Sequence, residues 1–324
     1  MDGEYIEVRA DPEDEALFRR FMDLEAGPRR SLADIVMNKI SEKREEKEEQ
    51  SMAVEDQENE NNTGIDPKLV KIYSEVGEYL KRYKSGKLPK VFKILPGLSN
   101  WEELLYLTRP EEWSPHAVYA ATRIFASNLD PARAQRFFNN ILLPAVRDDI
   151  AASKKLNYHL YRALKKACYK PAAFYKGVLL PLCSSGNCSL REAHIVSSVV
   201  LKMSVPQIHS AATLLKLAQM RYSGAQSLFM SALINKKYTL PYRVIDAVVE
   251  HFMKFTEVEG KLPVIWHQCL LNFAQRYKQD ITREQKDQMK NLLKAHYHYA
   301  ITPEIRREVF NSTSRGETKV ISSV

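Results

Sequence analysis

Apolar residues recur at helical spacing along most of the chain after Gly64, and we find no alternating pattern typical of a β-strand. Prolines separate the successive helical segments, and glycine is scarce, with eleven in the whole chain. The pattern therefore predicts an all-α fold of about a dozen proline-delimited helices, arranged as a bundle or as an irregular, superhelical α-solenoid. No fixed repeat period is visible, so no named repeat class is predicted.

Capping patterns indicate where several of these helices begin. A serine or threonine followed three residues later by Glu or Gln has the spacing of a capping box, in which the two residues satisfy each other's free backbone N–H groups. A capping side chain before proline is a second start signal, because proline is favoured in the first helical turn. The first pattern occurs at Ser99, Ser189 and Thr282, and the second at Ser114, Asp130 and Thr302.

Residues 1–64 form an acidic arm, with nineteen Asp and Glu against nine Lys and Arg. Two short amphipathic segments, 12–22 and 31–40, predict helices. The second carries an apolar stripe that we expect to dock on a partner: Leu32, Ile35, Val36 and Ile40. The stretch 41–63 has almost no large apolar residue and predicts partial disorder. The predicted organisation is this arm, an all-α body over 65–310 and a flexible tail over 311–324.

The body is basic, and its positive charge is concentrated between Ile150 and Ile245. This segment has fourteen Lys and Arg against one carboxylate, Glu192, a net charge of +13. A field of one sign over so long a stretch repels itself, and a polyanion that neutralises it is the simplest explanation. Nucleic acid is therefore the predicted partner. The alternative is that the charges are only solvated helix faces.

Residues 150–167 are predicted to form one amphipathic helix at the start of this basic segment. Its apolar face is Leu156, Leu160, Ala163, Leu164 and Ala167, and its other face carries cations and tyrosines. Such a face suits phosphate pairing and stacking on unpaired bases. The candidate RNA-binding residues are Lys154, Lys155, Tyr158, Arg162, Lys165, Lys166, Tyr169, Lys170 and Lys176. The alternative is a solvated helix whose tyrosines cover the core.

Other chemistry finds little support in the sequence. There is no phosphate-binding glycine loop, and Cys183 and Cys188 lack a second ligand pair for zinc, so we expect a capped turn between helices there. Asp148 and Asp149 point in different directions on a helix and predict ion pairs rather than catalysis. The Trp266-His267-Gln268-Cys269 run predicts core and surface positions. We predict no catalytic residues, no metal, no cofactor and no small-molecule substrate.

The composition also bears on the compartment. Four cysteines are too few for a disulfide framework and predict free thiols in a reducing compartment. The longest apolar runs, such as 177–183, are far shorter than the roughly twenty residues that span a bilayer. The first ten residues have no signal-peptide pattern. We therefore expect an intracellular protein without a membrane partner.

Several long segments resemble, in order, the bystin family of eukaryotic small-ribosomal-subunit assembly factors. They include LPKVFKILPGLSNWEELLYLT from Leu88, RFFNNILLPAVRDDI from Arg136, LNYHLYRALKKACYKPAAFYKG from Leu156, PLCSSGNCSLREA from Pro181 and LPVIWHQCLLNFAQRYK from Leu262. The resemblance covers roughly residues 10–310. Bystins usually carry a longer charged N-terminal extension, whereas this chain begins almost at the arm.

The resemblance implies a non-enzymatic scaffold of the nucleus and nucleolus that shuttles to the cytoplasm with the pre-40S particle. Its implied partners are precursor small-subunit rRNA, ribosomal proteins and other pre-40S assembly factors, and its implied roles are pre-18S rRNA processing and 40S maturation and export. The alternative from another class is a protein-interaction adaptor of a cytoskeletal or cell-adhesion complex, without direct RNA binding. A third possibility, an RNA-modifying enzyme, lacks a cofactor motif.

Overall fold

The computed structural model describes residues 67–317, and every regular element in this range is a helix. The predicted all-α class is therefore confirmed for these residues. No helix within 67–317 is long and apolar enough to cross a bilayer. The predicted docking residues Leu32, Ile35, Val36 and Ile40 lie outside the described range.

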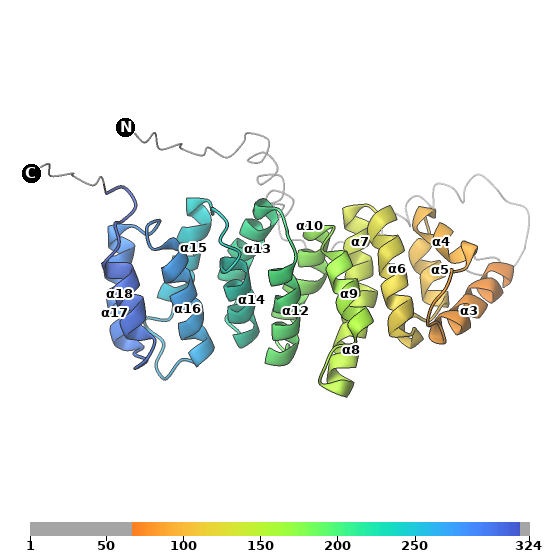
Figure 1. Cartoon of the computed structure of the whole chain (residues 1–324), viewed down its shortest axis with the longest axis horizontal. Coiled ribbons are helices and arrows are strands. Elements are labelled where there is room, and N and C mark those ends of the chain that lie inside the picture. The colour runs from red at the N-terminus through yellow and green to blue at the C-terminus, as the bar shows by residue number, and fades with distance from the viewer. Residues whose placement is uncertain (1–66, 318–324) are drawn as a thin grey trace, which may run out of the picture. The chain divides into compact units, whose positions relative to one another are not determined.

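The helices follow one another through short connections (Figure 1). The first part contains α3 (Pro67–Lys81), α4 (Lys90–Ile94), η1 (Leu95–Gly97), α5 (Trp101–Leu107), η2 (Pro110–Glu112), α6 (Pro115–Asn128), α7 (Pro131–Phe137), η3 (Phe138–Leu142), α8 (Leu143–Ser153) and α9 (Tyr158–Ala167). The second contains α10 (Pro171–Phe174), η4 (Tyr175–Leu179), α11 (Leu180–Ser184), α12 (Leu190–Lys202), α13 (Gln207–Gln219), α14 (Gly224–Ile234), α15 (Tyr242–Met253), α16 (Val264–Tyr277), α17 (Arg283–Ala295) and α18 (Thr302–Phe310).

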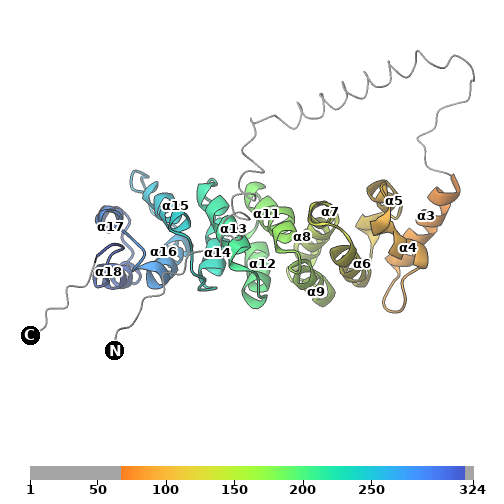
Figure 2. The same cartoon turned by 90° about the horizontal axis from the view of Figure 1, so that it is seen from above.

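From α6 onward the helices form two layers, seen from above in Figure 2. In one layer, α6, α9, α12, α14, α16 and α18 each pack against the next. The other layer contains the runs α7–η3–α8 and α10–η4–α11, followed by α13, α15 and α17. Buried apolar side chains such as Phe125, Phe174 and Phe252 fill the space between the layers. This alternation is the packing that an irregular α-solenoid has.

Two neighbouring runs of the second layer share a sequence pattern that the search for a fixed repeat missed. FFNNILLP over 137–144 and FYKGVLLP over 174–181 both contain a π-helical turn, η3 or η4, followed by an α-helix with proline near its start. Proline has no N–H to donate to the preceding turn, and the wider π-turn accommodates the missing hydrogen bond. The two units are thus related in local geometry as well as in sequence.

Three of the predicted start signals are confirmed in full. Ser189 and Thr282 form capping boxes with Glu192 and Gln285, in front of α12 and α17. Ser114 caps α6, and its Oγ accepts the Ala117 N–H at 3.1 Å. Their hydroxyls satisfy backbone donors that the helix itself leaves free.

The other three signals differ from the prediction. Ser99 does not cap a helix, because Asn100 takes the N-cap position of α5 and no side chain bonds there. Asp130 precedes α7 as predicted, but its carboxylate accepts no capping hydrogen bond. Thr302 is the first residue of α18, after Ile301. A local sequence pattern predicts the region where a helix begins more reliably than it predicts which residue caps the helix.

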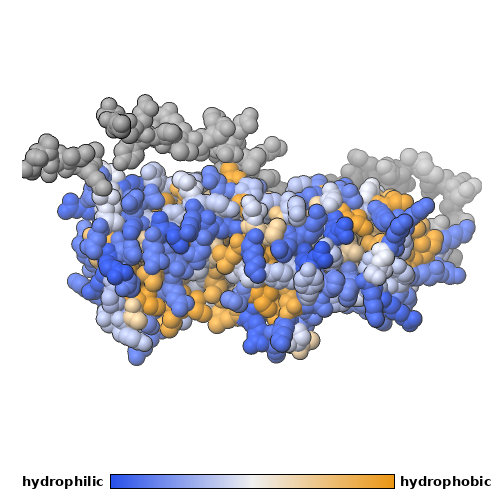
Figure 3. All heavy atoms as spheres, in the orientation of Figure 1, coloured by the Kyte–Doolittle hydropathy of each residue, from blue (hydrophilic) through white to orange (hydrophobic). Residues whose placement is uncertain are grey.

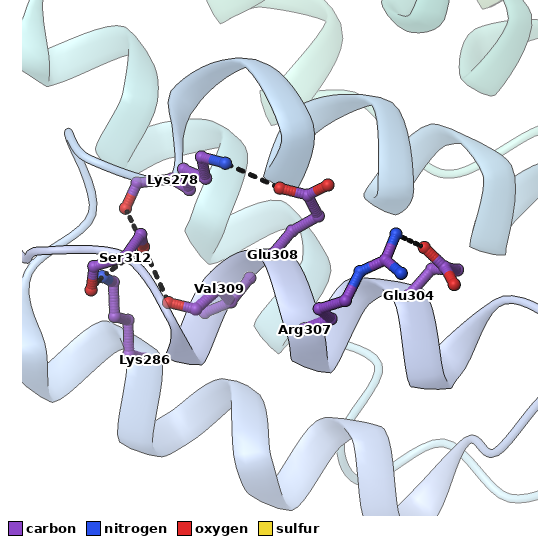
Figure 4. Close-up of polar contacts among 7 residues, drawn as sticks. All are labelled: Lys278, Lys286, Glu304, Arg307, Glu308, Val309 and Ser312. Carbon is purple, nitrogen blue, oxygen red and sulfur yellow. Dashed lines mark hydrogen bonds and ion pairs between the residues drawn. The ribbon is translucent and has the colours of Figure 1, made fainter.

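Residues 311–317, within the predicted flexible tail, are held against the last helices (Figure 4). Lys286 is 6% exposed, and its Nζ donates to the Ser312 carbonyl at 2.9 Å, the Ser312 Oγ at 2.8 Å and the Thr313 carbonyl at 2.9 Å. Arg315 forms an ion pair with Asp246 at 2.9 Å. We call residues 312–315 the C-terminal clasp, because it joins α15 to α17.

Candidate nucleic-acid interface

The predicted helix over 150–167 is wrong as a single element, because the chain turns between α8 and α9. Lys154 ends α8 with a left-handed backbone, φ 59°. Asn157 caps α9, and its Oδ1 accepts the His159 N–H at 2.9 Å. Asp149 Oδ2 accepts the Asn157 N–H at 2.7 Å. Asparagine is a strong N-cap, and this local bonding competes with a continuous helix.

The same contact corrects the predicted role of the two aspartates. The Asp149 carboxylate holds the backbone at the start of α9 instead of a cation. Among the described residues, neither Asp148 nor Asp149 forms an ion pair. The aspartates therefore contribute to the α8–α9 turn rather than to an ionic network.

Helix α9 has the buried and exposed sides that the sequence predicts. Leu160, Ala163, Leu164 and Ala167 are buried, whereas Leu156 lies half-buried before the helix. The opposite side carries a stripe, which we call the α9 stripe: Tyr158, Arg162, Lys166 and, just past the helix end, Tyr169. Tyr158 is 66% exposed and Tyr169 is 68% exposed. Two aromatic rings thus face solvent beside two cations.

The cations of the α9 stripe lie over aromatic faces. The Arg162 guanidinium carbon is 4.7 Å from the centre of the Tyr119 ring and 5.7 Å from that of Tyr158. The Lys166 Nζ is 4.0 Å from the centre of the Tyr169 ring. Neither cation forms an ion pair with a carboxylate of the described residues. Their charge therefore remains available to an anion other than these carboxylates.

Lys154 and Lys155 belong to the turn, so the prediction that they share one helix face with Arg162, Lys165 and Lys166 is wrong. Lys155 is exposed in the link between α8 and α9. Lys154 lines a pocket of about 460 Å³ between the end of α8 and the start of α12, together with Arg147 and Arg191. Arg191 Nη1 donates to the Lys154 carbonyl at 3.1 Å. The turn is thus a second cationic region, next to α9 in the chain.

The remaining candidate lysines have the same intermediate exposure as Lys166. Lys165, Lys170 and Lys176 are half-buried. Burial lowers the pKa of Lys170, which directly precedes α10. Lys176 belongs to η4, in the layer opposite α9. Lys165 is seven residues after Tyr158 on α9 and therefore lies on the same side of the helix as the α9 stripe. The structure does not bring Lys170 and Lys176 into the α9 stripe.

Residues of α6 that the sequence analysis missed lie against α9. The rings of His116 and His159 have their centres 3.8 Å apart, and the Arg123 guanidinium carbon is 5.8 Å from the centre of the Tyr119 ring. We define the α6–α9 seam by six residues: His116, Tyr119, Arg123, Tyr158, His159 and Arg162. The spacing of His116, Tyr119 and Arg123 places them on one side of a helix, and this could have been read from the sequence. The sequence does not show which other helix that side contacts.

The turn between Cys183 and Cys188 connects two helices, as predicted. It runs from the end of α11 to the capping box of α12. Burial raises the pKa of the Cys183 thiol to about 12 and that of the Cys188 thiol to about 11. Both are free thiols.

Glu192, the one carboxylate of the basic segment, is used inside the fold. It receives the Ser189 N–H at 2.7 Å and the Arg147 Nε–H at 3.0 Å. Burial would raise the pKa of Glu192, but the hydrogen bonds from Ser189 and Arg147 lower it below its usual value. The carboxylate is therefore ionised and joins α8 to α12.

We expect Ser189→Ala to lower the free energy of unfolding by about 0.5 to 2 kcal/mol, because the Glu192 N–H then loses its hydroxyl acceptor. Urea unfolding followed by circular dichroism measures the difference. Ser85→Ala, at an exposed position outside any helix, is the matched control and should leave stability unchanged. Equal stability of the two variants would contradict a stabilising role for the capping box.

His267 and Cys269, which the sequence predicts to be structural, are buried residues of α16. Burial raises the pKa of the Cys269 thiol to about 12. Burial, with His298 and His296 nearby, lowers the pKa of His267 to about 4. A protonated thiol and a neutral imidazole are thus both inside the protein, where they take part in packing.

Known proteins resemble the chain over most of its length. Residues 26–319 match the family model of Bystin. Bystin of Nematostella vectensis is 56% identical over 315 residues, which cover 96% of this chain and 71% of that protein. Human Bystin is 52% identical over 318 residues, covering 97% of this chain and 71% of the relative. Bystin of Arabidopsis thaliana is 48% identical over 305 residues, covering 94% and 67%.

Proposed function

Since the chain belongs to the bystin family, we propose that it is a non-catalytic helical scaffold of ribosome assembly. It binds precursor small-subunit rRNA through the α9 stripe, and ribosomal proteins and pre-40S assembly factors through other surfaces. In this role it supports pre-18S rRNA processing and the maturation and export of the 40S subunit. It acts in the nucleus and nucleolus and travels to the cytoplasm with the particle.

The observation that carries the proposal is the placement of Arg162 and Lys166 on aromatic rings at the surface of α9, with no carboxylate partner among residues 67–317. The segment 150–245 has fourteen cationic side chains and one carboxylate, Glu192, which is engaged with Ser189 and Arg147. Arg162 and Lys166 lie on aromatic rings at the surface instead of pairing with acids. RNA phosphates would supply the missing negative charge, and binding would release their counterions.

The distribution of hydrophilic and apolar residues on the surface also supports a polar partner. On the face drawn in Figure 3, hydrophilic side chains predominate and apolar surface forms separate patches. Such a face suits phosphate and base contacts better than the continuous apolar groove that receives an amphipathic helix. The arm residues Leu32, Ile35, Val36 and Ile40 remain the predicted site for a protein partner.

We expect the triple change Lys155→Gln, Arg162→Gln and Lys166→Gln to weaken RNA binding and to make it less sensitive to salt. Each lost phosphate contact should lower the slope of log affinity against log salt by about one. Fluorescence anisotropy with a single-stranded fragment of small-subunit rRNA, repeated over a salt series, measures both effects. Thermal unfolding should hardly change, because the three side chains do not belong to the core.

The matched control is Lys84→Gln, Lys87→Gln and Lys90→Gln, which removes the same charge from exposed positions near α4. This variant should keep a steeper salt slope than the α9 variant. Equal slopes would place the RNA surface elsewhere. If the unaltered chain bound no RNA even at low salt, direct RNA binding would be refuted and a protein-interaction adaptor would become the better description.

A further inference from the structure

Cations and rings alternate along the α6–α9 seam. The Arg123 guanidinium carbon lies 5.8 Å from the centre of the Tyr119 ring. The Arg162 guanidinium carbon lies 4.7 Å from the centre of the same ring and 5.7 Å from the centre of the Tyr158 ring. His116 and His159, each the second residue of its helix, stack at 3.8 Å. The two helices therefore run in the same direction, with their starts side by side.

The arginines of the seam have unused hydrogen-bond donors. Neither α6 nor α9 contains Asp or Glu. Among residues 67–317, no carboxylate pairs with the guanidinium of Arg123 or Arg162, and both residues are exposed. Asp149, just before the α8–α9 turn, already receives the Asn157 N–H. A guanidinium that lies against aromatic faces keeps its N–H edge in the plane, where it can meet the two oxygens of a phosphate.

The rings supply the second half of a binding site. Tyr158 is 66% exposed although it contacts both His159 and Arg162. A tyrosine whose only role was to pack α6 against α9 would bury more of its ring. The Arg162 guanidinium carbon is 5.7 Å from the centre of this exposed ring, so an aromatic surface and a phosphate-binding edge are adjacent. These are the two groups that a nucleotide with an unstacked base requires.

We propose that the α6–α9 seam binds an unpaired nucleotide of single-stranded RNA, with its base stacked on Tyr158 and its phosphate on the N–H edge of Arg162. The inference rests on the proposed function and goes further by naming the form of RNA and the contacts. The bases of a duplex are stacked on one another and offer no free face to a tyrosine. The seam therefore favours single strands over duplexes, whereas the surrounding lysines attract both.

Two variants that leave the formal charge unchanged test the site. Tyr158→Leu removes the stacking ring, and Arg162→Lys keeps the charge but loses the planar edge. The probes are a fluorescein-labelled oligouridine of about ten nucleotides and an RNA duplex with a similar number of phosphates. Tyr158→Leu should bind oligouridine about five-fold to a hundred-fold more weakly. Arg162→Lys should also bind it more weakly, and both should keep the wild-type affinity for the duplex and the wild-type salt slope.

Tyr297→Leu is the matched control, because Tyr297 is 61% exposed and lies between α17 and α18. Circular dichroism and thermal unfolding show whether each variant is folded, and the exposed position of Tyr158 makes its loss easy to tolerate. If Tyr158→Leu and Tyr297→Leu bound oligouridine equally well while the wild-type chain bound RNA in a salt-dependent way, the seam would be refuted and the proposed function would stand. If the wild-type chain bound neither probe, both proposals would fail.

Discussion

Replacement of Gly177 by alanine is expected to lower the free energy of unfolding by about 1 to 3 kcal/mol, because the second-layer runs cross too closely for a methyl group. A Cβ atom at Gly177 would lie 2.7 Å from the Gln135 carbonyl oxygen and 3.2 Å from the Phe138 Cβ. A backbone carbonyl cannot rotate away as a flexible side chain does, so η4 would have to move from α7 and η3. Alanine is the better helix former by about 1 kcal/mol, and the clash must outweigh this gain.

Urea unfolding of the whole chain measures the effect of Gly177→Ala. Gly97→Ala is the control, because no atom lies within 4 Å of a Cβ built at Gly97 and its backbone is not left-handed. We expect the control to be at least as stable as the wild-type chain. A Gly177→Ala variant of wild-type stability would mean that α10–η4–α11 shifts without cost, and the close crossing would then not hold the two runs in register.

Acidification from pH 6.5 to about 4 is expected to cost the wild-type chain about 3 kcal/mol more than a His267→Phe variant. His267 is 3% exposed, and its Nδ1 has no hydrogen-bond partner among residues 67–317. Burial, with the charges of His298 and His296, lowers its pKa from 6.5 to about 4. In the unfolded chain the His267 imidazole is protonated below about pH 6.5, whereas in the folded chain it is protonated only below about pH 4. The contribution of His267 to the free energy of unfolding is therefore constant above pH 6.5 and decreases as the pH is lowered from 6.5 to about 4.

The measurement is urea unfolding at several pH values, with the two chains compared at each pH so that the carboxylates common to both cancel. Phenylalanine keeps an aromatic ring against Trp266, whose ring centre is 4.9 Å from that of His267. His194→Gln, at an exposed histidine, is the control and should follow the wild-type pH profile. Parallel profiles for wild type and His267→Phe would show that His267 titrates normally in the folded protein.

The sequence predicts well whatever depends on neighbours along the chain. The capping boxes at Ser189 and Thr282 follow from a hydroxyl and a carboxyl or amide three residues apart. The buried side of α9 follows from the spacing of Leu160, Ala163 and Leu164, because one helix can bury only one side against its layer. The charge of the basic segment is likewise a property of composition, and the sequence alone therefore indicates α9 as a candidate site.

Features that depend on contacts between distant segments escape sequence reasoning. The α8–α9 turn is missed because an asparagine in a helical pattern gives no sign of whether it caps or continues, and Asp149 decides the matter by bonding Asn157. The share of Tyr119 and His116 in the candidate site depends on α6 packing against α9. Lys286 reads as a solvated lysine of an amphipathic helix, yet it is enclosed by carbonyl oxygens of the clasp.

The two-layer packing from α6 onward has a mechanical consequence. Each pair of helices contacts mainly the pairs beside it, so no single core has to break for the row to bend. Small rotations between successive helix pairs add up, so the row of helices can bend elastically along its whole length. At the C-terminal end, the clasp binds Lys286 of α17 and Asp246 of α15. A force that pulls on α18 is therefore transmitted to α15 and α17 instead of detaching the final helix alone.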